Sequence, residues 1–193
     1  MDKSENRIGI LGGSFDPIHI GHLILAEYAL TECKLDKILF IPNRIPNLKQ
    51  PPQASARHRY QMIKLAIQDN PKFEVSDIEI KREGISYSYD TVTALKKKFK
   101  NDKLFFIIGS DAYNSLPKWK NFKKLITEIE FIVAIRPGSK IKKIPQIKFQ
   151  LLNIPEIAIS SSYIRKRVKK GRSIRYLVPD RVWQYICEYK LYT

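Results

Sequence analysis

The stretch GGSFDPIHIGH, residues 12–22, joins an apolar run to a helical pattern and decides the fold. The run before it, residues 7–11 (RIGIL), has the length and composition of a buried strand. After it, residues 20–33 carry apolar side chains at the spacing of one helix face. Glycines in a strand-to-helix turn let the backbone approach a phosphate, and the N–H groups of such a turn attract anions. The stretch therefore predicts an anion site where a strand passes into a helix.

Two histidines, His19 and His22, fall in the opening turn of this expected helix, and Pro17 fixes the chain just ahead of it. A separation of three residues places both imidazoles on one helix face. They face the same space as the helix N-terminus, which also favours negative charge. No Ser-His-Asp or Cys-His nucleophile arrangement is visible. Because phosphoryl-type transfer needs mainly positioning and charge stabilisation, the pair predicts a reaction at phosphoryl oxygens.

Strand-like and helical segments alternate along the whole sequence. Strands are expected at residues 7–11, 37–42, 73–81, 103–108, 130–135, 147–152 and 157–159. Helices are expected at residues 20–33, 55–68 with Ser55 as cap, 88–99 with Ser88 as cap, 122–128, 160–170 with Ser160 or Ser161 as cap, and 179–189 with Pro179 in the first turn. Such alternation implies an α/β fold with a mostly parallel central sheet and helices on both faces.

The ends of the expected strands place the ligand site. Ligands of open parallel sheets lie beyond the carboxyl ends of the strands, so the loops after Leu11, Pro42 and Ile108 are expected to meet. Neither an internal repeat nor a low-complexity linker interrupts the sequence. We therefore expect residues 1–193 to form a single domain.

The composition is that of an ordinary globular protein with a large positive charge. The 193 residues are 44% hydrophobic and 28% charged, and the net charge is +16. Residues 136–175 hold twelve Lys or Arg against one acid, Glu156. Such an excess can mark a nucleic-acid binder, but the aromatic residues are spread along the chain rather than interleaved with it. We expect a solvated basic face that partly serves a polyphosphate substrate, and no nucleic-acid partner.

The sequence lacks the signals of export, membrane insertion and metal binding. No apolar run has the length of a membrane span, and the polar start MDKSENR has no signal-peptide pattern. The two cysteines, Cys33 and Cys187, lie far apart and without metal-ligand spacing. We expect a cytoplasmic protein with no membrane partner, no disulfide framework and no zinc site, since this cysteine usage fits a reducing compartment.

Residues 12–22 strongly resemble the nucleotidylyltransferase superfamily, whose shared signature is His-x-Gly-His. The signature stands here as HIGH, residues 19–22. Class I aminoacyl-tRNA synthetases share these four letters, but they need a longer chain and a KMSKS-type loop, and this sequence has neither. The resemblance implies a Rossmann-like three-layer nucleotidylyltransferase fold.

Further segments, in matching order, resemble the bacterial nicotinate-mononucleotide adenylyltransferase family, which acts in NAD synthesis. They are IPNRIPNLKQ (residues 41–50), REGISYSYDT (82–91), GSD (109–111) followed by Trp119, ISSSYIR (159–165) and the ending SIRYLVPDRVWQYI (173–186). The sequence departs from the family's usual residues at several positions. Ser14 replaces the more usual threonine, Leu48 replaces a histidine beside Lys49, and Ser110 replaces an alanine. A role of that histidine is therefore not carried over.

The resemblance implies an enzyme that joins nicotinate mononucleotide to the AMP part of ATP and releases pyrophosphate. Mg²⁺ is implied as cofactor, held more by phosphates and water than by a protein cage. His19 and His22 are the implied catalytic residues, which stabilise the triphosphate and the transition state. The implied ATP-binding residues are Gly12, Gly13, His19, His22, Gly109, Asp111, Ser161, Ser162 and Arg165. The implied residues for nicotinate mononucleotide are Ser14, Phe15, Asp16, Lys49, Ser88, Tyr89 and Trp119.

Several of these residues also have a structural interpretation, which the sequence leaves open. Asp16 can cap the loop instead of acting near a metal, Trp119 can pack instead of stacking on the pyridine ring, and Lys49 and Arg165 can be solvent-exposed. A homo-oligomer is also left open. Two other functions remain: an adenylyltransferase with nicotinamide mononucleotide or phosphopantetheine as acceptor, and a basic nucleic-acid-binding module, whose binding would depend strongly on salt.

Overall fold

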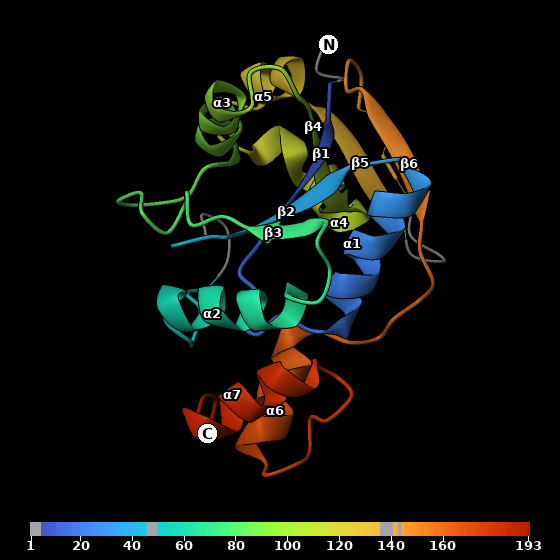
Figure 1. Ribbon diagram of the computed structural model, residues 1–193. Helices are drawn as coiled ribbons and strands as arrows, with labels where there is room; N and C mark the ends of the chain where they lie inside the picture. The colour runs from blue at the N-terminus through green and yellow to red at the C-terminus, as the bar shows by residue number, and fades with distance from the viewer. Residues whose placement is uncertain (1–4, 46–49, 136–140, 143) are drawn as a thin grey trace.

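The computed structural model describes residues 5–45, 50–135, 141–142 and 144–193. Six parallel strands form one sheet in the order β3-β2-β1-β4-β5-β6 (Figure 1). The strands are β1 (Arg7–Gly13), β2 (Lys37–Pro42), β3 (Phe73–Val75), β4 (Lys103–Gly109), β5 (Glu130–Ile135) and β6 (Phe149–Asn153). The chain builds outward from β1 through β2 and then continues on the other side at β4. The topological switch point, where ligands of such sheets bind, therefore lies between β1 and β4.

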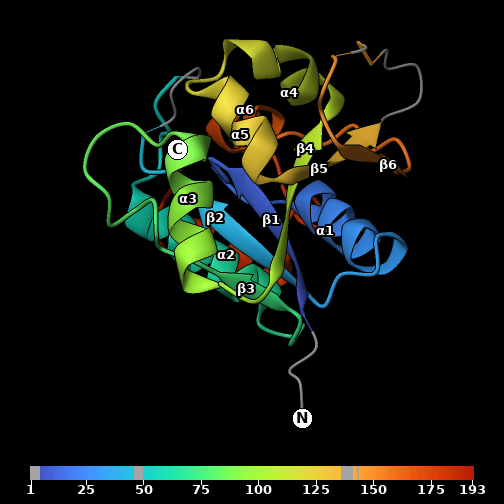
Figure 2. The ribbon, with the colours of Figure 1, turned by 90° about the horizontal axis from the view of Figure 1, so that it is seen from above.

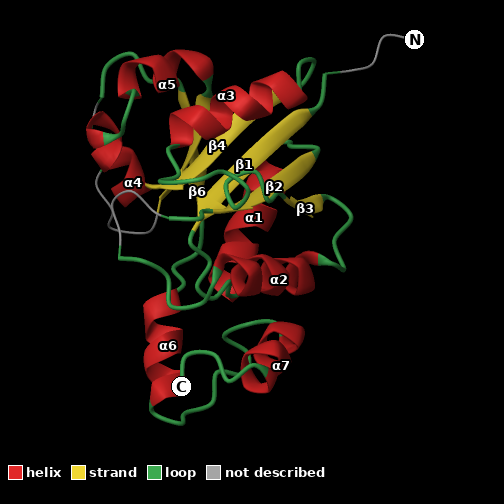
Figure 3. Ribbon diagram, turned by 90° about the vertical axis from the view of Figure 1, so that its left-hand side faces the viewer, coloured by secondary structure: helices red, strands yellow, loops and turns green. Residues whose placement is uncertain are grey.

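Helices cover both faces of the sheet (Figure 3). One face carries α1 (Ile20–Glu32) and α2 (Ala56–Ile67), and α6 (Ser161–Lys169) and α7 (Asp180–Glu188) lie beyond α2 on the same side (Figure 1). The other face, which Figure 2 looks down upon, carries α3 (Ser88–Lys98), α4 (Ser110–Ser115), the 3-10 turn η1 (Leu116–Lys118) and α5 (Phe122–Glu128). Within the described part of the chain, none of the helices has both the length and the apolar character that a membrane crossing needs.

The strands supply apolar side chains to both faces. In β2, Ile38 and Phe40 join the buried cluster beneath α1 and α2, whereas Leu39 and Ile41 join the cluster beneath α3 and α5. Successive side chains of a strand point to opposite faces, so a strand covered on both sides consists of consecutive apolar residues. This geometry explains the continuous apolar run in β2, and it confirms the expected α/β fold with helices on both faces.

Several expected elements are confirmed in their bounds or caps. The strands at residues 37–42 and 130–135 and the helix at 122–128 have the predicted limits. Ser55 caps α2, because its Oγ accepts a hydrogen bond from the backbone N of His58 at 3.3 Å. Ser160, one of two candidates, caps α6 by accepting from the backbone N of Tyr163 at 3.2 Å. Local side-chain chemistry decided these helix starts.

Other expectations are wrong. The strand expected at residues 73–81 ends at Val75, because β3 is an edge strand that pairs with β2 over only three residues. Residues 157–159 form no strand; they run past the end of the sheet, where Ile157 and Ile159 line a cavity. Ser88 is the first residue of α3 and Tyr87 is its cap, while Pro179 is the cap of α7 rather than part of its first turn. The helix α4 was not expected, because six residues are too few to display a helical period.

Candidate active site

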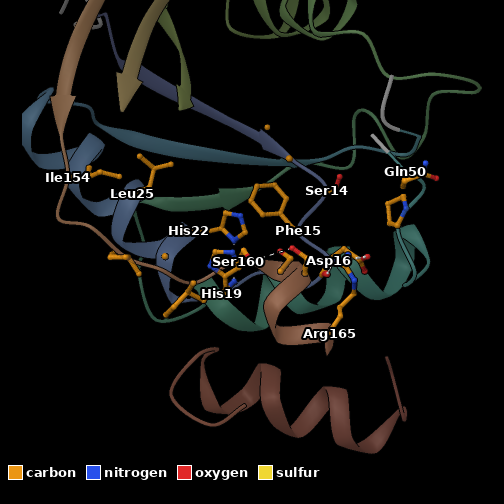
Figure 4. Close-up of a pocket in the computed structure, with 18 of the residues that line it drawn as sticks. Ser14, Phe15, Asp16, His19, His22, Leu25, Gln50, Ile154, Ser160 and Arg165 are labelled. Atoms are coloured by element: carbon orange, nitrogen blue, oxygen red, sulfur yellow. Dashed lines mark hydrogen bonds and ion pairs between the residues drawn. The ribbon is translucent and has the colours of Figure 1, made fainter. Parts of the chain in front are cut away.

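A cavity of about 510 Å³ lies at the carboxyl end of β1, beside the switch point of the sheet (Figure 4). Three segments line it: the turn after β1 with the start of α1, the segment before α2, and the segment that leads from β6 into α6. The lining residues are 12–16, 19, 21, 22, 25, 50–52, 154, 155, 157, 159–162 and 165. Both the size and the position are those of a small-molecule site.

Many of the predicted site residues meet in this cavity. The loops after β1 and β2 lie together as expected, since Asn43 donates from its backbone N to the Gly13 carbonyl at 3.0 Å and from Nδ2 to Ser14 Oγ at 3.2 Å. The residues brought together are Gly12, Gly13, Ser14, Phe15, Asp16, His19, His22, Ser161, Ser162 and Arg165. The loop after β4, by contrast, does not line the cavity.

The turn after β1 is held by a buried aromatic ring. Phe15 has a φ of 48°, a conformation that is rare for a bulky residue, and it is only 2% exposed. Its ring packs edge-on against His22 with centroids 5.0 Å apart, and against Phe40 of the core. Burial of the ring therefore holds this backbone conformation and turns the chain towards α1.

Asp16 orients this turn. Its side chain is nearly inaccessible, and Oδ2 accepts a hydrogen bond from the backbone N of Gln53 at 2.8 Å. Oδ1 accepts from the backbone N of Ala54 at 3.0 Å and from the Tyr192 hydroxyl at 2.8 Å. Both carboxylate oxygens are engaged with protein donors, which favours the loop-capping interpretation of Asp16 over contact with a metal.

A buried arginine in α2, Arg59, ties the loops around the cavity together. It is 1% exposed and donates to the carbonyl oxygens of Ser14 at 2.7 Å, Asn43 at 2.7 Å and Ala54 at 3.2 Å. Burial lowers the pKa of Arg59, and the negative charge of Asp16 opposes this shift. The loops after β1 and β2 and the start of α2 are thus fixed by one cation.

The two imidazoles of the HIGH signature lie face to face at the start of α1. Their ring centroids are 3.7 Å apart with planes inclined by 27° (Figure 4). His19 is the cap residue, one position before the helix, and His22 occupies the third helical position. The backbone N of His19 donates to Nδ1 of His22 at 3.2 Å, as the third residue of a capping box does. A neutral His22 therefore carries its proton on Nε2, which can donate to an anion.

The start of α6 forms the opposite wall. Ser161 donates from Oγ to the carbonyl of Pro17 at 2.8 Å, and Arg165 donates from Nη1 to the carbonyl of Asp16 at 2.7 Å. Arg165 Nη1 also lies 3.7 Å from Oδ2 of Asp16. Among the described lining residues Arg165 is the one Lys or Arg side chain. The positive ends of two helix dipoles, of α1 and α6, and this guanidinium give the cavity the character of an anion site.

Five predicted residues lie outside this cavity lining. Gly109 ends β4 and Asp111 is the second residue of α4; both are exposed. Ser88 and Tyr89 are the first two residues of α3. Trp119 is half-buried, donates from Nε1 to Ser115 at 3.3 Å and packs edge-on against Phe106. These contacts give Trp119 a packing role, which does not exclude a ligand on its remaining surface.

Two hydrogen bonds connect the segment that follows β2 with the residues just before α3. The backbone N of Ser86 donates to the carbonyl of Ile45 at 3.0 Å, and the backbone N of Arg44 donates to Ser86 Oγ at 3.2 Å. The predicted phosphate ligand Lys49 and the departure at Leu48 lie outside the described residues.

Sequence reasoning missed Arg59 and Tyr192. Arg59 occupies a position in α2 whose neighbours have an ordinary helical pattern, and Tyr192 lies in the last few residues of the sequence. Neither position belongs to a motif, and a buried arginine is uncommon. Gln50, Pro51 and Pro52 also line the cavity. Gln50 is the last residue of the segment 41–50, one of those that resemble the family. The contacts of Arg59 with Ser14 and of Tyr192 with Asp16 join residues that lie far apart in the chain, so no local pattern indicated them.

No metal-binding cluster stands out near the cavity. Over the described ranges there is no group of three or more His, Cys, Asp or Glu side chains suited to hold a metal ion. The carboxylate that comes nearest to this role, Asp16, is already engaged by backbone N–H groups and Tyr192.

Comparisons with known proteins agree with the fold and identify the family. Residues 10–167 match the family described as cytidylyltransferase-like. A nicotinate-nucleotide adenylyltransferase of Bacillus subtilis is 45% identical over 187 residues, which cover 96% of this chain and 98% of that protein. A probable nicotinate-nucleotide adenylyltransferase of Dictyoglomus turgidum is 45% identical over 193 residues, covering 96% and 95%. The solved structure of the Plasmodium falciparum nicotinic acid mononucleotide adenylyltransferase complexed with NaAD superposes with a TM-score of 0.82 at 26% identity, covering 97% of this chain and 98% of that one. With the HIGH signature at the cavity and relatives of nearly the same length, the chain belongs to the cytidylyltransferase-like family and, within it, to the nicotinate-nucleotide adenylyltransferases.

Proposed function

We propose that this chain transfers the AMP part of ATP to nicotinate mononucleotide in NAD biosynthesis. An oxygen of the acceptor phosphate attacks the α-phosphorus in line, the bond from that phosphorus to the bridging oxygen breaks, and pyrophosphate leaves with the electron pair. The products are deamido-NAD and pyrophosphate, without a covalent enzyme intermediate. The observation that carries this proposal is the stacked pair His19–His22 on a cavity between two helix N-termini, and the names of relatives 45% identical over 96% of the chain support the acceptor.

The triphosphate binds between the start of α1 and the start of α6 in this proposal. Nε2 of His22 and the imidazole of His19 donate to phosphoryl oxygens on which charge develops in the transition state. Arg165 and the helix start at Ser161 and Ser162 hold the β- and γ-phosphates, Arg165 by charge-assisted hydrogen bonds. Gly12 and Gly13 let the phosphates approach the backbone, because a glycine has no side chain in the way.

The adenosine extends from the cavity towards the end of β4. In the sheet, Leu11 of β1 is paired with Ile107 of β4, so the two strands end at the same edge of the sheet. Asp111 follows in α4 and is exposed. In this proposal Gly109 and Asp111 lie beside the nucleotide, and Asp111 is suited to accept hydrogen bonds from the ribose or the adenine.

The acceptor occupies the side of the cavity towards α3. Backbone N–H groups of Ser14 and Phe15 face its phosphate, with Lys49 as an additional cation. The first N–H groups of α3, those of Ser88 and Tyr89, are suited to hold the nicotinate carboxylate because the N-terminus of a helix favours an anion. The accessible surface of Trp119 is suited to stack on the pyridine ring.

Mg²⁺ belongs to this reaction as part of the ATP substrate. The described residues do not fit a resident metal site, because no three-ligand group is present among them and Asp16 is engaged by protein donors. Mg²⁺ on the triphosphate, held by phosphate oxygens and water, offsets negative charge. The protein contributes the histidine pair, Arg165 and the helix N-termini.

A panel of acceptors tests the proposal. The enzyme is supplied with ATP and Mg²⁺ together with nicotinate mononucleotide, nicotinamide mononucleotide or phosphopantetheine, and pyrophosphate release is measured. We expect turnover with nicotinate mononucleotide and a lower kcat/KM with the amide, which lacks the carboxylate. Absence of turnover with nicotinate mononucleotide overturns the proposed acceptor, and turnover with phosphopantetheine alone replaces it.

We also propose that the protein works in the cytoplasm. Both cysteines are free thiols, one buried and one exposed, and neither forms a disulfide in the structure. A free exposed thiol is suited to a reducing compartment. Cell fractionation followed by the pyrophosphate assay tests this location.

A further inference from the structure

The hydroxyl of Tyr192 donates a 2.8 Å hydrogen bond to Oδ1 of Asp16, 176 positions earlier in the sequence. Tyr192 is half-buried, and its φ of 68° turns the chain so that the ring faces inward. Asp16 is 3% exposed and belongs to the turn that leads to His19. Tyr192, near the end of the sequence, thus contacts Asp16, a residue that lines the cavity.

Asp16 contacts both Tyr192 and Arg165, and therefore links the two side chains. Arg165 Nη1 donates to the Asp16 carbonyl at 2.7 Å and lies 3.7 Å from the carboxylate Oδ2. The side chain of Arg165 is 26% exposed and lines the cavity. The position of the guanidinium therefore depends on both the backbone and the side chain of Asp16 (Figure 4).

The hydroxyl of Tyr192 keeps its proton and can therefore donate the hydrogen bond to Asp16. Burial raises the pKa of Tyr192, and the neighbouring negative charge of Asp16 raises it further, against the opposing effects of Arg165 and Arg59. The phenol therefore stays protonated at neutral pH. A buried carboxylate needs its hydrogen-bond donors, because an unsatisfied charge in the interior is costly.

We propose that Tyr192 is a positioning residue for ATP: its hydroxyl fixes the carboxylate of Asp16, which in turn holds the guanidinium of Arg165 towards the triphosphate. Tyr192 itself is not among the residues that line the cavity. The inference rests on the proposed function, since it assigns Arg165 to the phosphates of ATP. It predicts an effect on ATP affinity that the acceptor does not share.

The first test removes only the hydroxyl, in the variant Tyr192→Phe. We expect the KM for ATP to rise about fivefold, while the KM for nicotinate mononucleotide changes little. The melting temperature should fall by a few degrees, because the buried carboxylate loses one of its donors. Tyr189→Phe is the matched control, because Tyr189 lies on the same segment, is 50% exposed, and its ring contacts with His58 and Tyr185 do not need a hydroxyl. An unchanged KM for ATP in Tyr192→Phe overturns the proposal, as does an equal rise in both KM values.

A second test distinguishes positioning from a general structural role. In a double-mutant cycle, Tyr192→Phe is combined with Arg165→Lys, which keeps the charge but loses the two-point geometry. If Tyr192 acts through Arg165, Tyr192→Phe adds little to the KM for ATP in the Arg165→Lys background. Full additivity overturns the proposed route.

Two controls keep the outcomes separate. Turnover of the unmodified protein with ATP and nicotinate mononucleotide is measured first, and its absence rejects the proposed function rather than the role of Tyr192. If Tyr192→Phe does not fold, Asp16→Asn tests the same route, because the amide loses its charge attraction to Arg165. A KM for ATP in Asp16→Asn equal to that of the unmodified protein then overturns the proposal.

Discussion

The guanidinium of Arg59 donates a 2.7 Å hydrogen bond to the carbonyl oxygen of Ser14, joining α2 to the turn after β1. The same side chain serves the carbonyls of Asn43 and Ala54, so three segments around the cavity depend on one buried cation. The turn that leads to the histidines is thus fixed by a buried side chain that is not part of the cavity lining, which leads to the first prediction.

Replacement of Arg59 by methionine is expected to destabilise the protein by about 3 kcal/mol. The buried carbonyl oxygens lose their donor, and the buried Asp16 loses a neighbouring positive charge. Urea denaturation measures the change in the free energy of unfolding. Arg57→Met, at an exposed position of the same helix, is the control and should stay within about 0.5 kcal/mol of the unmodified protein. Equal denaturation midpoints for the two variants would contradict the role of Arg59.

Removal of either imidazole of the stacked pair is expected to reduce kcat by about a hundredfold, because each provides a donor to the transition state. Both His19→Ala and His22→Ala should remain folded, with melting temperatures a few degrees lower at most, since only a helix cap is weakened. The third histidine, His58, contacts Tyr185 in α7 and does not line the cavity. His58→Asn should therefore keep the normal kcat. Normal turnover of His19→Ala would mean that the HIGH segment is structural.

A methyl group added at Gly21 is expected to separate activity from stability. A Cβ at this position would meet Nδ1 of His19 at 3.1 Å and its Cε1 at 3.2 Å, so the ring has to shift. Alanine is also the better helix former by about 0.5–1 kcal/mol. Gly21→Ala should lower kcat about tenfold without lowering the melting temperature. An unaltered kcat, or a loss of stability alone, would show that the position of the His19 ring does not matter.

Glu79 is expected to make the stability of the protein fall as the pH rises. Burial raises the pKa of Glu79, although hydrogen bonds from Thr91 and Ser86 and the charge of Arg82 oppose the shift. The folded state therefore holds its proton to higher pH than the unfolded state does, and the contribution that is complete below the unfolded pKa is lost as the pH rises through the folded pKa.

Glu79→Gln removes this titration but can still accept a hydrogen bond from Thr91, which lies at 2.6 Å. Relative to the unmodified protein, the melting temperature of the variant should increase as the pH rises above about 4.5, the ordinary pKa of the carboxyl group. The exposed acid Glu83 provides the control Glu83→Gln, which should follow the unmodified protein. A constant difference for Glu79→Gln across this range would refute the prediction.

Local signals in the sequence were sufficient for much of the fold. The apolar runs of β2 and β5 indicated where these strands lie because both faces of the strands are buried, so the residues inside each strand had to be apolar. Ser55 and Ser160 marked helix starts because capping uses the side chain of the cap residue itself. At α3 the cap is Tyr87, which makes no side-chain capping bond, and this start was therefore misplaced by one residue.

The candidate site was also predictable from the sequence only in part. The histidine pair was predictable, since a separation of three residues is a local property of a helix. The expected strand at residues 157–159 failed because nothing in its apolar pattern shows that β6 already closes that edge of the sheet. Whether Asp16 serves a metal or the loop was equally undetermined, because the donors to its carboxylate come from residues 37, 38 and 176 positions away.

The sequence by itself determined the strand-to-helix turn, the paired imidazoles and the parallel α/β class, all of which follow from periods and caps within a few residues. Only the tertiary structure decided that α6 faces α1 across the cavity, that Arg59 fastens the loops, and that Tyr192 and Arg165 meet at Asp16. The physical reason is that buried charges and backbone carbonyls must find partners in space. Which residues become those partners depends on how the chain packs, so it cannot be predicted from a local sequence pattern.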